Sequence, residues 1–240
     1  MKHAGRRDRL RAVLPAGAAA MIVTSASNVR YLSGFTGSNG ALLIAADPVH
    51  DRLGTDFRYV TQSVAQCPDL ELVVARAVLP QLVDHAEELR LGPLAFEADH
   101  VSVAAHAALL GVHPRLPLLA SSGLVEALRV VKDDSELALL ARACRISDAA
   151  LADLTPTVQV GQTEREIARR LEALMLDHGA EAVSFDTIVA GGPNSAVPHH
   201  RPTDRPLARG DLLKIDFGAL YEGYHADETR TFVVGAPPQG

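Results

Sequence analysis

The stretch LLKIDFG at residues 212–218, followed after a short turn by YHADETRTFVV at 224–234, decides the fold of the second half of the chain. Both runs are typical of β-strands, and they predict an antiparallel hairpin that turns within residues 219–223. Asp216 interrupts the apolar first strand, and Asp227 follows 11 positions later in the second. A hairpin centred near residues 221–222 therefore brings the two aspartates close together across the strands.

Two carboxylates on adjacent strands repel and desolvate each other unless a cation or a proton neutralises them. Oxygen ligands favour hard divalent ions such as manganese or magnesium over a zinc site of the thiolate type. Thr229 shares a strand face with Asp227, since side chains alternate with a period of two, and it can hydrogen-bond a ligating carboxylate. The spacing alone leaves open the alternative that each aspartate is a turn or edge residue facing water.

His199 and His200 follow Pro198 in a stretch rich in glycine, proline and asparagine. A histidine in such a loop can stabilise a developing oxyanion or transfer a proton. A solvated loop histidine is the alternative interpretation. We expect His200 to point elsewhere and to matter much less than His199.

Two helices are predicted before these strands. One begins near Asp133 or Asp134, either of which can cap it, and runs to about residue 154. The other begins with Thr163 as its N-cap and Glu166 three residues later as the partner in a capping box. Helices followed by strands predict an α+β second domain.

The first half of the chain alternates short apolar strands with helical segments, which predicts an open α/β sheet. We expect strands near residues 20–23, 41–45, 70–75 and 94–97, and helices near 78–90 and 101–111. Residues 51–56 and 112–123 have the composition of a turn and a linker. The predicted domains are 1–123 and 124–240.

Composition limits the possible functions. A length of 240 residues favours two domains, and a net charge of −6 without a Lys/Arg cluster argues against a nucleic-acid partner. No apolar run reaches the roughly 18 residues that a membrane span needs. The two cysteines, Cys67 and Cys144, lie far apart, which fits a reducing cytoplasm and excludes both a disulfide scaffold and a cysteine zinc cluster.

Several runs, taken together and in this order, closely resemble the Xaa-Pro peptidase family, which comprises proline dipeptidase and aminopeptidase P. They are NVRYLSGFTGSNG at 28–40, TDFRY at 55–59, SFDTIVA at 184–190, PNSAVPH at 193–199, GDLLKIDFG at 210–218 and GYHADETRT at 223–231. The resemblance implies a creatinase-like α/β N-terminal domain with a mixed sheet and helices. It also implies that residues 124–240 are the first half of an α+β pita-bread metallopeptidase domain.

The resemblance also implies roles for single residues. Asp216 and Asp227 match carboxylate ligands of a centre of two divalent metal ions, typically manganese or cobalt. His199 matches the substrate-facing catalytic histidine, and Phe185 matches a position that lines the substrate pocket. The implied activity is hydrolysis of the peptide bond preceding proline, in proline-containing peptides, by a protein that is a homodimer when full length.

The chain also departs from the family pattern. The family supplies a further histidine and two further glutamates as metal ligands, and these have no counterpart up to Gly240. We therefore expect the site to be incomplete and the isolated 240-residue chain not to hydrolyse Xaa-Pro peptides. Two alternatives stay open, namely a creatinase-type amidinohydrolase on the same scaffold and a non-catalytic family member.

Overall fold

The computed structural model describes residues 2–235, and the chain forms two compact units, Met1–Val131 and Lys132–Gly240. The division lies eight residues beyond the boundary predicted from the sequence, because helix α6 (Leu124–Val130) packs within the first unit. There it contacts α1 (Lys2–Arg11) and α2 (Ala26–Ser33). Val125 is fully buried, and the Tyr31 hydroxyl donates to the Leu128 carbonyl at 3.3 Å.

A six-stranded mixed sheet forms the centre of the first unit, with strand order β4-β3-β2-β1-β5-β6. The pairs β1/β2 and β2/β3 are antiparallel and the other pairs are parallel, which confirms the predicted mixed α/β sheet. The strands are β1 (Ala20–Val23), β2 (Gly40–Ala45), β3 (Arg52–Thr55), β4 (Glu71–Val74), β5 (Leu94–Glu97) and β6 (Leu118–Ser121).

Two of these strands correct the sequence prediction. β3 lies in the segment predicted as a turn, and β6 lies in the segment predicted as a linker. Both are short, and each completes its backbone hydrogen bonds with a strand that local sequence does not reveal. β3 lies between β2 and β4, while β6 pairs with β5.

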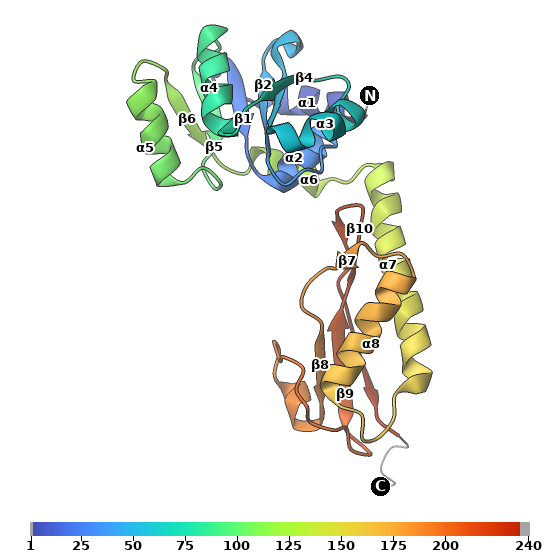
Figure 1. Ribbon diagram of the computed structural model, residues 1–240. Coiled ribbons are helices and arrows are strands. Elements are labelled where there is room, and N and C mark those ends of the chain that lie inside the picture. Colours follow the sequence, from blue (N-terminus) through green and yellow to red (C-terminus); the bar gives the residue numbers. More distant parts are fainter. Residues whose placement is uncertain (1, 236–240) are drawn as a thin grey trace. The chain divides into compact units, whose positions relative to one another are not determined.

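Helices cover both faces of this sheet (Figure 1). α4 (Val78–Glu88) and α5 (Val103–Val112) pack on one face, where Leu82 and Leu109 join the core. α1, α2 and α6 pack on the other face, where Leu10, Leu32 and Val125 are buried. The unit also contains α3 (Val60–Gln66) and two short 3-10 turns, Pro48–His50 and Phe57–Tyr59.

The second unit begins with two long helices, α7 (Asp134–Leu154) and α8 (Glu164–Asp177). Each starts with a complete capping box, formed by Asp133 with Glu136 in α7 and by Thr163 with Glu166 in α8. The α8 start is confirmed, and of the two N-cap candidates for α7 the structure uses Asp133. A 3-10 turn, Thr155–Thr157, follows α7.

Short strands follow the helices and form two three-stranded sheets, β11-β10-β7 and β12-β9-β8. Their bounds are β7 (Ala182–Val183), β8 (Ile188–Gly191), β9 (Leu212–Phe217), β10 (Ala219–Tyr221), β11 (Tyr224–His225) and β12 (Glu228–Val233). A 3-10 turn, η4 (Gly192–Ala196), follows β8. Helices followed by antiparallel strands confirm the predicted α+β character of this unit.

The predicted hairpin is present and runs through both sheets. Tyr221 pairs with Tyr224, and further along Phe217 pairs with Glu228 in the same register. The turn residues Glu222 and Gly223 have φ angles of 45° and 76°, the left-handed values that a tight two-residue hairpin turn requires. The turn fixes the pairing of every residue in both arms.

One face of the β12-β9-β8 sheet packs against α7 and α8, which lie side by side in Figure 1. Leu213, Ile215 and Phe217 of β9 are fully buried on this face. Because side chains alternate along a strand, Lys214 and Asp216 lie on the opposite face. This second face carries the candidate site.

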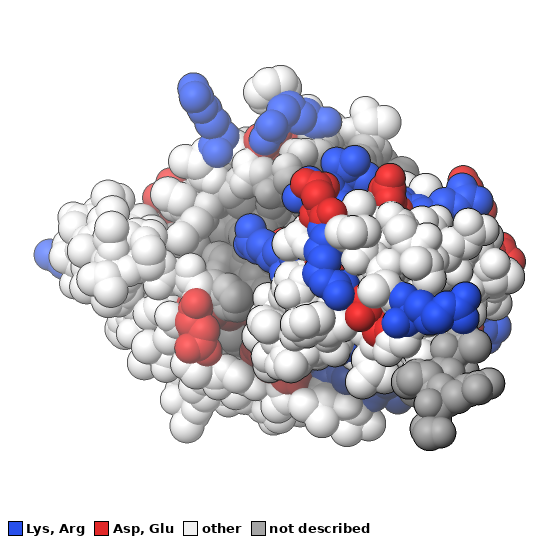
Figure 2. All heavy atoms as spheres, turned by 90° about the horizontal axis from the view of Figure 1, so that it is seen from below, with Lys and Arg blue, Asp and Glu red and all other residues white. Residues whose placement is uncertain are grey.

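Charged side chains of both signs lie at the surface, and Figure 2 shows lysine and arginine among aspartate and glutamate on one face. Within the described residues, the search for a helix both long and apolar enough to cross a membrane finds none.

Candidate functional site

Asp216 and Thr229 form a direct pair on the open face of the β9/β12 hairpin. Their Cα positions are register partners, and the Thr229 hydroxyl donates to Asp216 Oδ1 at 2.9 Å. Asp216 is half-buried and Thr229 is exposed. The threonine therefore orients one carboxylate oxygen of Asp216 and leaves the other oxygen without a hydrogen bond from the described residues.

Asp227 lies just before β12, two residues from Thr229 and thus on the same face. The sequence predicted that it would lie across from Asp216, but the turn is centred one residue later than expected, so Thr229 takes that position. The Asp227 side chain is exposed and has no hydrogen bond or ion pair within residues 2–235. The two carboxylates are thus diagonal neighbours on one face.

Gly218, at the junction of β9 and β10, allows the two arms of the hairpin to pass close to each other. A Cβ atom at Gly218 would lie 1.9 Å from the Ala226 carbonyl oxygen, so no other residue fits without moving the backbone. The two arms of the hairpin can therefore approach closely beside Asp227. This close approach keeps the register continuous from β9/β12 into β10/β11.

The donors on this face are carboxylate and hydroxyl oxygens, which fit a hard divalent ion. They are too few to complete its coordination, because such an ion takes about six oxygen ligands. Among residues 2–235, no group of three or more His, Cys, Asp or Glu side chains is placed to hold a metal ion. The described part of the chain therefore offers two carboxylates to a metal and cannot enclose it alone.

His199 lies in a turn that follows η4, and its side chain is exposed. Lys214, two residues before Asp216 on β9, anchors this turn. Its ammonium group donates to the carbonyl oxygens of Val197 at 2.7 Å and Pro198 at 3.3 Å. The turn that carries His199 is therefore tied to the strand that carries Asp216.

Phe185 is half-buried in the bend between β7 and β8. The preceding residue, Ser184, holds this bend to the hairpin. Its backbone N–H donates to the Gly218 carbonyl at 2.8 Å and its hydroxyl to the Ala219 carbonyl at 2.9 Å. Phe185 thus follows a residue that is fixed at the β9/β10 junction.

Sequence reasoning missed Glu164, the first residue of α8. Its side chain has no exposed surface, yet its pKa is lowered to about 2. Burial raises the pKa, and hydrogen bonds from Gly191, Asn194, His200 and Thr203 outweigh that effect. The sequence did contain one signal for Glu164. The first turn of α8 has two acidic residues, and its capping box uses only Glu166, so Glu164 is left for another role.

Each of the two units matches the model of a known protein family. The Creatinase/Prolidase N-terminal domain matches residues 6–131, and Metallopeptidase family M24 matches residues 138–240. The chain belongs to the creatinase/prolidase family. The predicted architecture, a creatinase-type N-terminal domain followed by part of a pita-bread domain, is confirmed.

Similar proteins include peptidases from several bacteria. The chain is 37% identical over 218 residues to the uncharacterized peptidase YqhT of Bacillus subtilis, covering 90% of this chain and 61% of that protein. The structure of the Xaa-Pro dipeptidase from Bacillus anthracis is similar with a TM-score of 0.92 and 35% identity, over 98% of this chain and 66% of that one. The X-Pro aminopeptidase from Thermotoga maritima gives a TM-score of 0.88 and 33% identity, over 97% and 66%. The chain thus spans somewhat less than two thirds of the length of these relatives.

Proposed function

We propose that this chain supplies metal ligands and substrate-facing residues to a metal-dependent Xaa-Pro peptidase. The observation that carries the proposal is the pair of carboxylates, Asp216 and Asp227, on the open face of one hairpin. Neither carboxylate has a charged partner within the described residues. The relatives named as an Xaa-Pro dipeptidase and an X-Pro aminopeptidase support proline-containing peptides as the substrate class.

Each residue has a separate task in this proposal. Asp216 and Asp227 would hold two divalent ions, manganese or cobalt, together with ligands outside the described residues. The Thr229 hydroxyl keeps Asp216 in a fixed orientation. When bound, the ions supply Lewis-acid activation of the scissile carbonyl and of the attacking water.

His199 and Phe185 act on the substrate in this proposal. The exposed imidazole of His199 donates a hydrogen bond or a proton to the oxygen on which charge develops. The ring of Phe185 forms an apolar wall of the substrate pocket. Lys214 keeps the His199 turn beside β9 through its two bonds to backbone carbonyls.

The test is hydrolysis by the natural gene product. We expect it to cleave a dipeptide such as Ala-Pro when manganese or cobalt is added, and to leave creatine unchanged. Hydrolysis of creatine instead would assign an amidinohydrolase. Manganese binding without hydrolysis of either compound would assign a non-catalytic family member.

Location and assembly belong to the same proposal. Cys67 and Cys144 are both free thiols, which supports the reducing cytoplasm as the compartment. We also propose a homodimer, which sedimentation of the natural gene product would detect directly.

A further inference from the structure

Glu164 is the centre of a buried hydrogen-bond cluster that the proposed reaction does not use directly. Its side chain lies at the N-terminus of α8 and has no exposed surface. Oε1 accepts from Gly191 N at 2.8 Å and from Asn194 Nδ2 at 2.9 Å. Oε2 accepts from His200 Nε2 at 2.8 Å, Thr203 N at 3.0 Å and Thr203 Oγ1 at 2.7 Å.

All five donors belong to residues 191–203, the segment that contains His199. One carboxylate oxygen holds the beginning of this segment, at Gly191 and Asn194, and the other holds its end, at His200 and Thr203. Buried carboxylates are tolerated when hydrogen bonds satisfy them, as here. A single side chain therefore fixes both ends of the loop.

The charge state of Glu164 determines which groups donate the hydrogen bonds of this cluster. With its pKa held at about 2, Glu164 is ionised near neutral pH and can only accept hydrogen bonds. The contact of 2.8 Å therefore requires a hydrogen on His200 Nε2. The His200 ring, only 12% exposed, is thus held in one orientation, with its Nε2 edge toward the Glu164 carboxylate.

Lys214 holds the same loop from the other side. Its bonds to the carbonyls of Val197 and Pro198 fix the two residues before His199, and the bond from His200 to Glu164 fixes the residue after it. The His199 side chain is exposed, while the residues on both sides of it are anchored, Val197 and Pro198 through their backbone carbonyls and His200 through its side chain.

We infer that Glu164 is a positioning residue that acts through His200 to present His199 beside the strand that carries Asp216. The catalytic meaning of this inference rests on the proposed peptidase function, but the anchoring of the loop does not. In this inference His200 has a role of its own, as the anchor next to His199. The role needs an N–H donor at this position, and it does not need an imidazole.

The experiment compares four variants of the natural gene product, Glu164→Gln, His200→Ala, His200→Gln and Glu166→Gln. Glu166→Gln is the matched control, because Glu166 lies in the same helical turn but bonds only within the capping box. His200→Gln keeps an N–H donor that can reach Glu164, whereas His200→Ala removes it. Hydrogen exchange of the backbone amides is measured by mass spectrometry, together with kcat, KM and manganese affinity.

We expect Glu164→Gln and His200→Ala to speed amide exchange about 10-fold or more at residues 192–203, with β9 and α7 unchanged. In both variants kcat falls about 10- to 100-fold, the range for residues that orient a catalytic group, while KM and manganese affinity stay within about 2-fold. His200→Gln and Glu166→Gln stay close to the wild type in every measurement.

Two results would overturn the inference. Unchanged exchange and unchanged kcat in Glu164→Gln would make the cluster irrelevant to the loop. Equal impairment of His200→Gln and His200→Ala would show that His200 acts by its own chemistry. If Glu164→Gln does not fold, the two His200 variants still decide the question. If the wild-type protein cleaves no Xaa-Pro peptide, the proposed function fails, and amide exchange alone decides the anchoring.

Discussion

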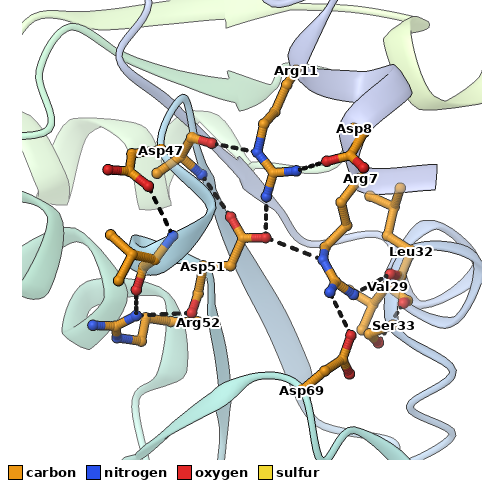
Figure 3. A network of polar contacts seen from close by, with 12 residues as sticks. Arg7, Asp8, Arg11, Val29, Leu32, Ser33, Asp47, Asp51, Arg52 and Asp69 are labelled. Atoms are coloured by element: carbon orange, nitrogen blue, oxygen red, sulfur yellow. Dashed lines mark hydrogen bonds and ion pairs between the residues drawn. The ribbon is translucent and has the colours of Figure 1, made fainter. Parts of the chain in front are cut away.

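The Asp51 cluster of the first unit and the Asp216/Asp227 face of the second use the same chemical group in opposite ways. Asp51 is buried and accepts from the Arg7 guanidinium at 3.1 Å, from Arg11 and from the Ala45 backbone N–H at 3.1 Å (Figure 3). It thereby joins α1 to the C-terminal end of β2. Asp216 has one neutral donor, and Asp227 has none among residues 2–235.

The difference separates carboxylates that hold the fold from carboxylates available to a ligand. Removing a buried carboxylate that two guanidinium groups share deprives both groups of their common buried acceptor. Asp216 and Asp227 have no charged partner among the described residues, and they keep free oxygen lone pairs for a cation. Removing a carboxylate should therefore cost stability in the first region and activity in the second.

The largest effect is expected for Asp227→Ala. Losing a metal ligand removes several kcal/mol of transition-state stabilisation, so Ala-Pro hydrolysis should fall about 1,000-fold or more, together with manganese binding. The free energy of unfolding should change by less than about 0.5 kcal/mol, since the side chain is exposed and without partners.

Asp177→Ala serves as its control, because Asp177 is also exposed and lies at the end of α8 in the same unit. It should leave hydrolysis and metal binding unchanged. Full activity of Asp227→Ala would end the assignment of this residue as a ligand.

Asp51→Ala should show the opposite behaviour to Asp227→Ala, namely a large loss of stability. Breaking a buried ion pair by removing one partner costs about 3–5 kcal/mol, which urea denaturation of the first unit would report. Asp8→Ala removes the exposed partner of Arg11 from the same network and should cost less than about 1 kcal/mol. Equal losses in the two variants would contradict the contrast between buried and exposed carboxylates.

Glu164 makes stability depend on pH. Its folded-state pKa is about 2 against an ordinary value of 4.5, so its contribution is complete above pH 4.5 and is lost as pH falls towards 2. The free energy of unfolding should differ between wild type and Glu164→Gln by on the order of 3 kcal/mol at pH 6, and this difference should shrink as pH falls from about 4.5 towards 2.

The charged and titratable neighbours of Glu164 are His200, Arg205 and Asp211. All three are present in both proteins, so the difference between the two curves reports Glu164 together with its interactions with these neighbours. A difference that does not vary between pH 5 and pH 2 would refute the cause assigned to the lowered pKa.

His199→Ala tests the exposed histidine of the second unit. Removing one oxyanion-stabilising or proton-transfer group should lower kcat about 100-fold. Manganese affinity should stay the same, because His199 is not a proposed ligand. Steady-state kinetics and a manganese titration separate the two outcomes, and an unchanged kcat would leave His199 without a catalytic role.

The smallest effect is expected for Thr229→Val. Losing the hydrogen bond to Asp216 should weaken manganese binding about 10-fold, as for other residues that orient a ligand. Thr231→Val is the matched control, since Thr231 lies on the same face opposite Lys214. Equal affinities in the two variants would show that the hydrogen bond does not orient a ligand.

Local patterns were enough to predict much of the fold. The capping box of Thr163 and Glu166 lies within four residues, and the hairpin around Glu222 and Gly223 has a turn of two residues. Short-range hydrogen bonds and turn angles determine such features, so the sequence predicts that they exist, although it placed the turn of the hairpin one residue too early. The strands β3 and β6 escaped prediction because each depends on a partner strand for its backbone hydrogen bonds.

The sequence by itself determined the family and the two-unit order, and it supplied the residues proposed for a metal site, because these depend on residue types and short spacings. Only the tertiary structure decided that Thr229 lies opposite Asp216 and that Glu164 holds the His199 loop. The donors to Glu164 lie 27 to 39 residues away along the chain, so no local pattern records them. Packing brings the loop onto the start of α8, and burial then makes each of those hydrogen bonds costly to lose.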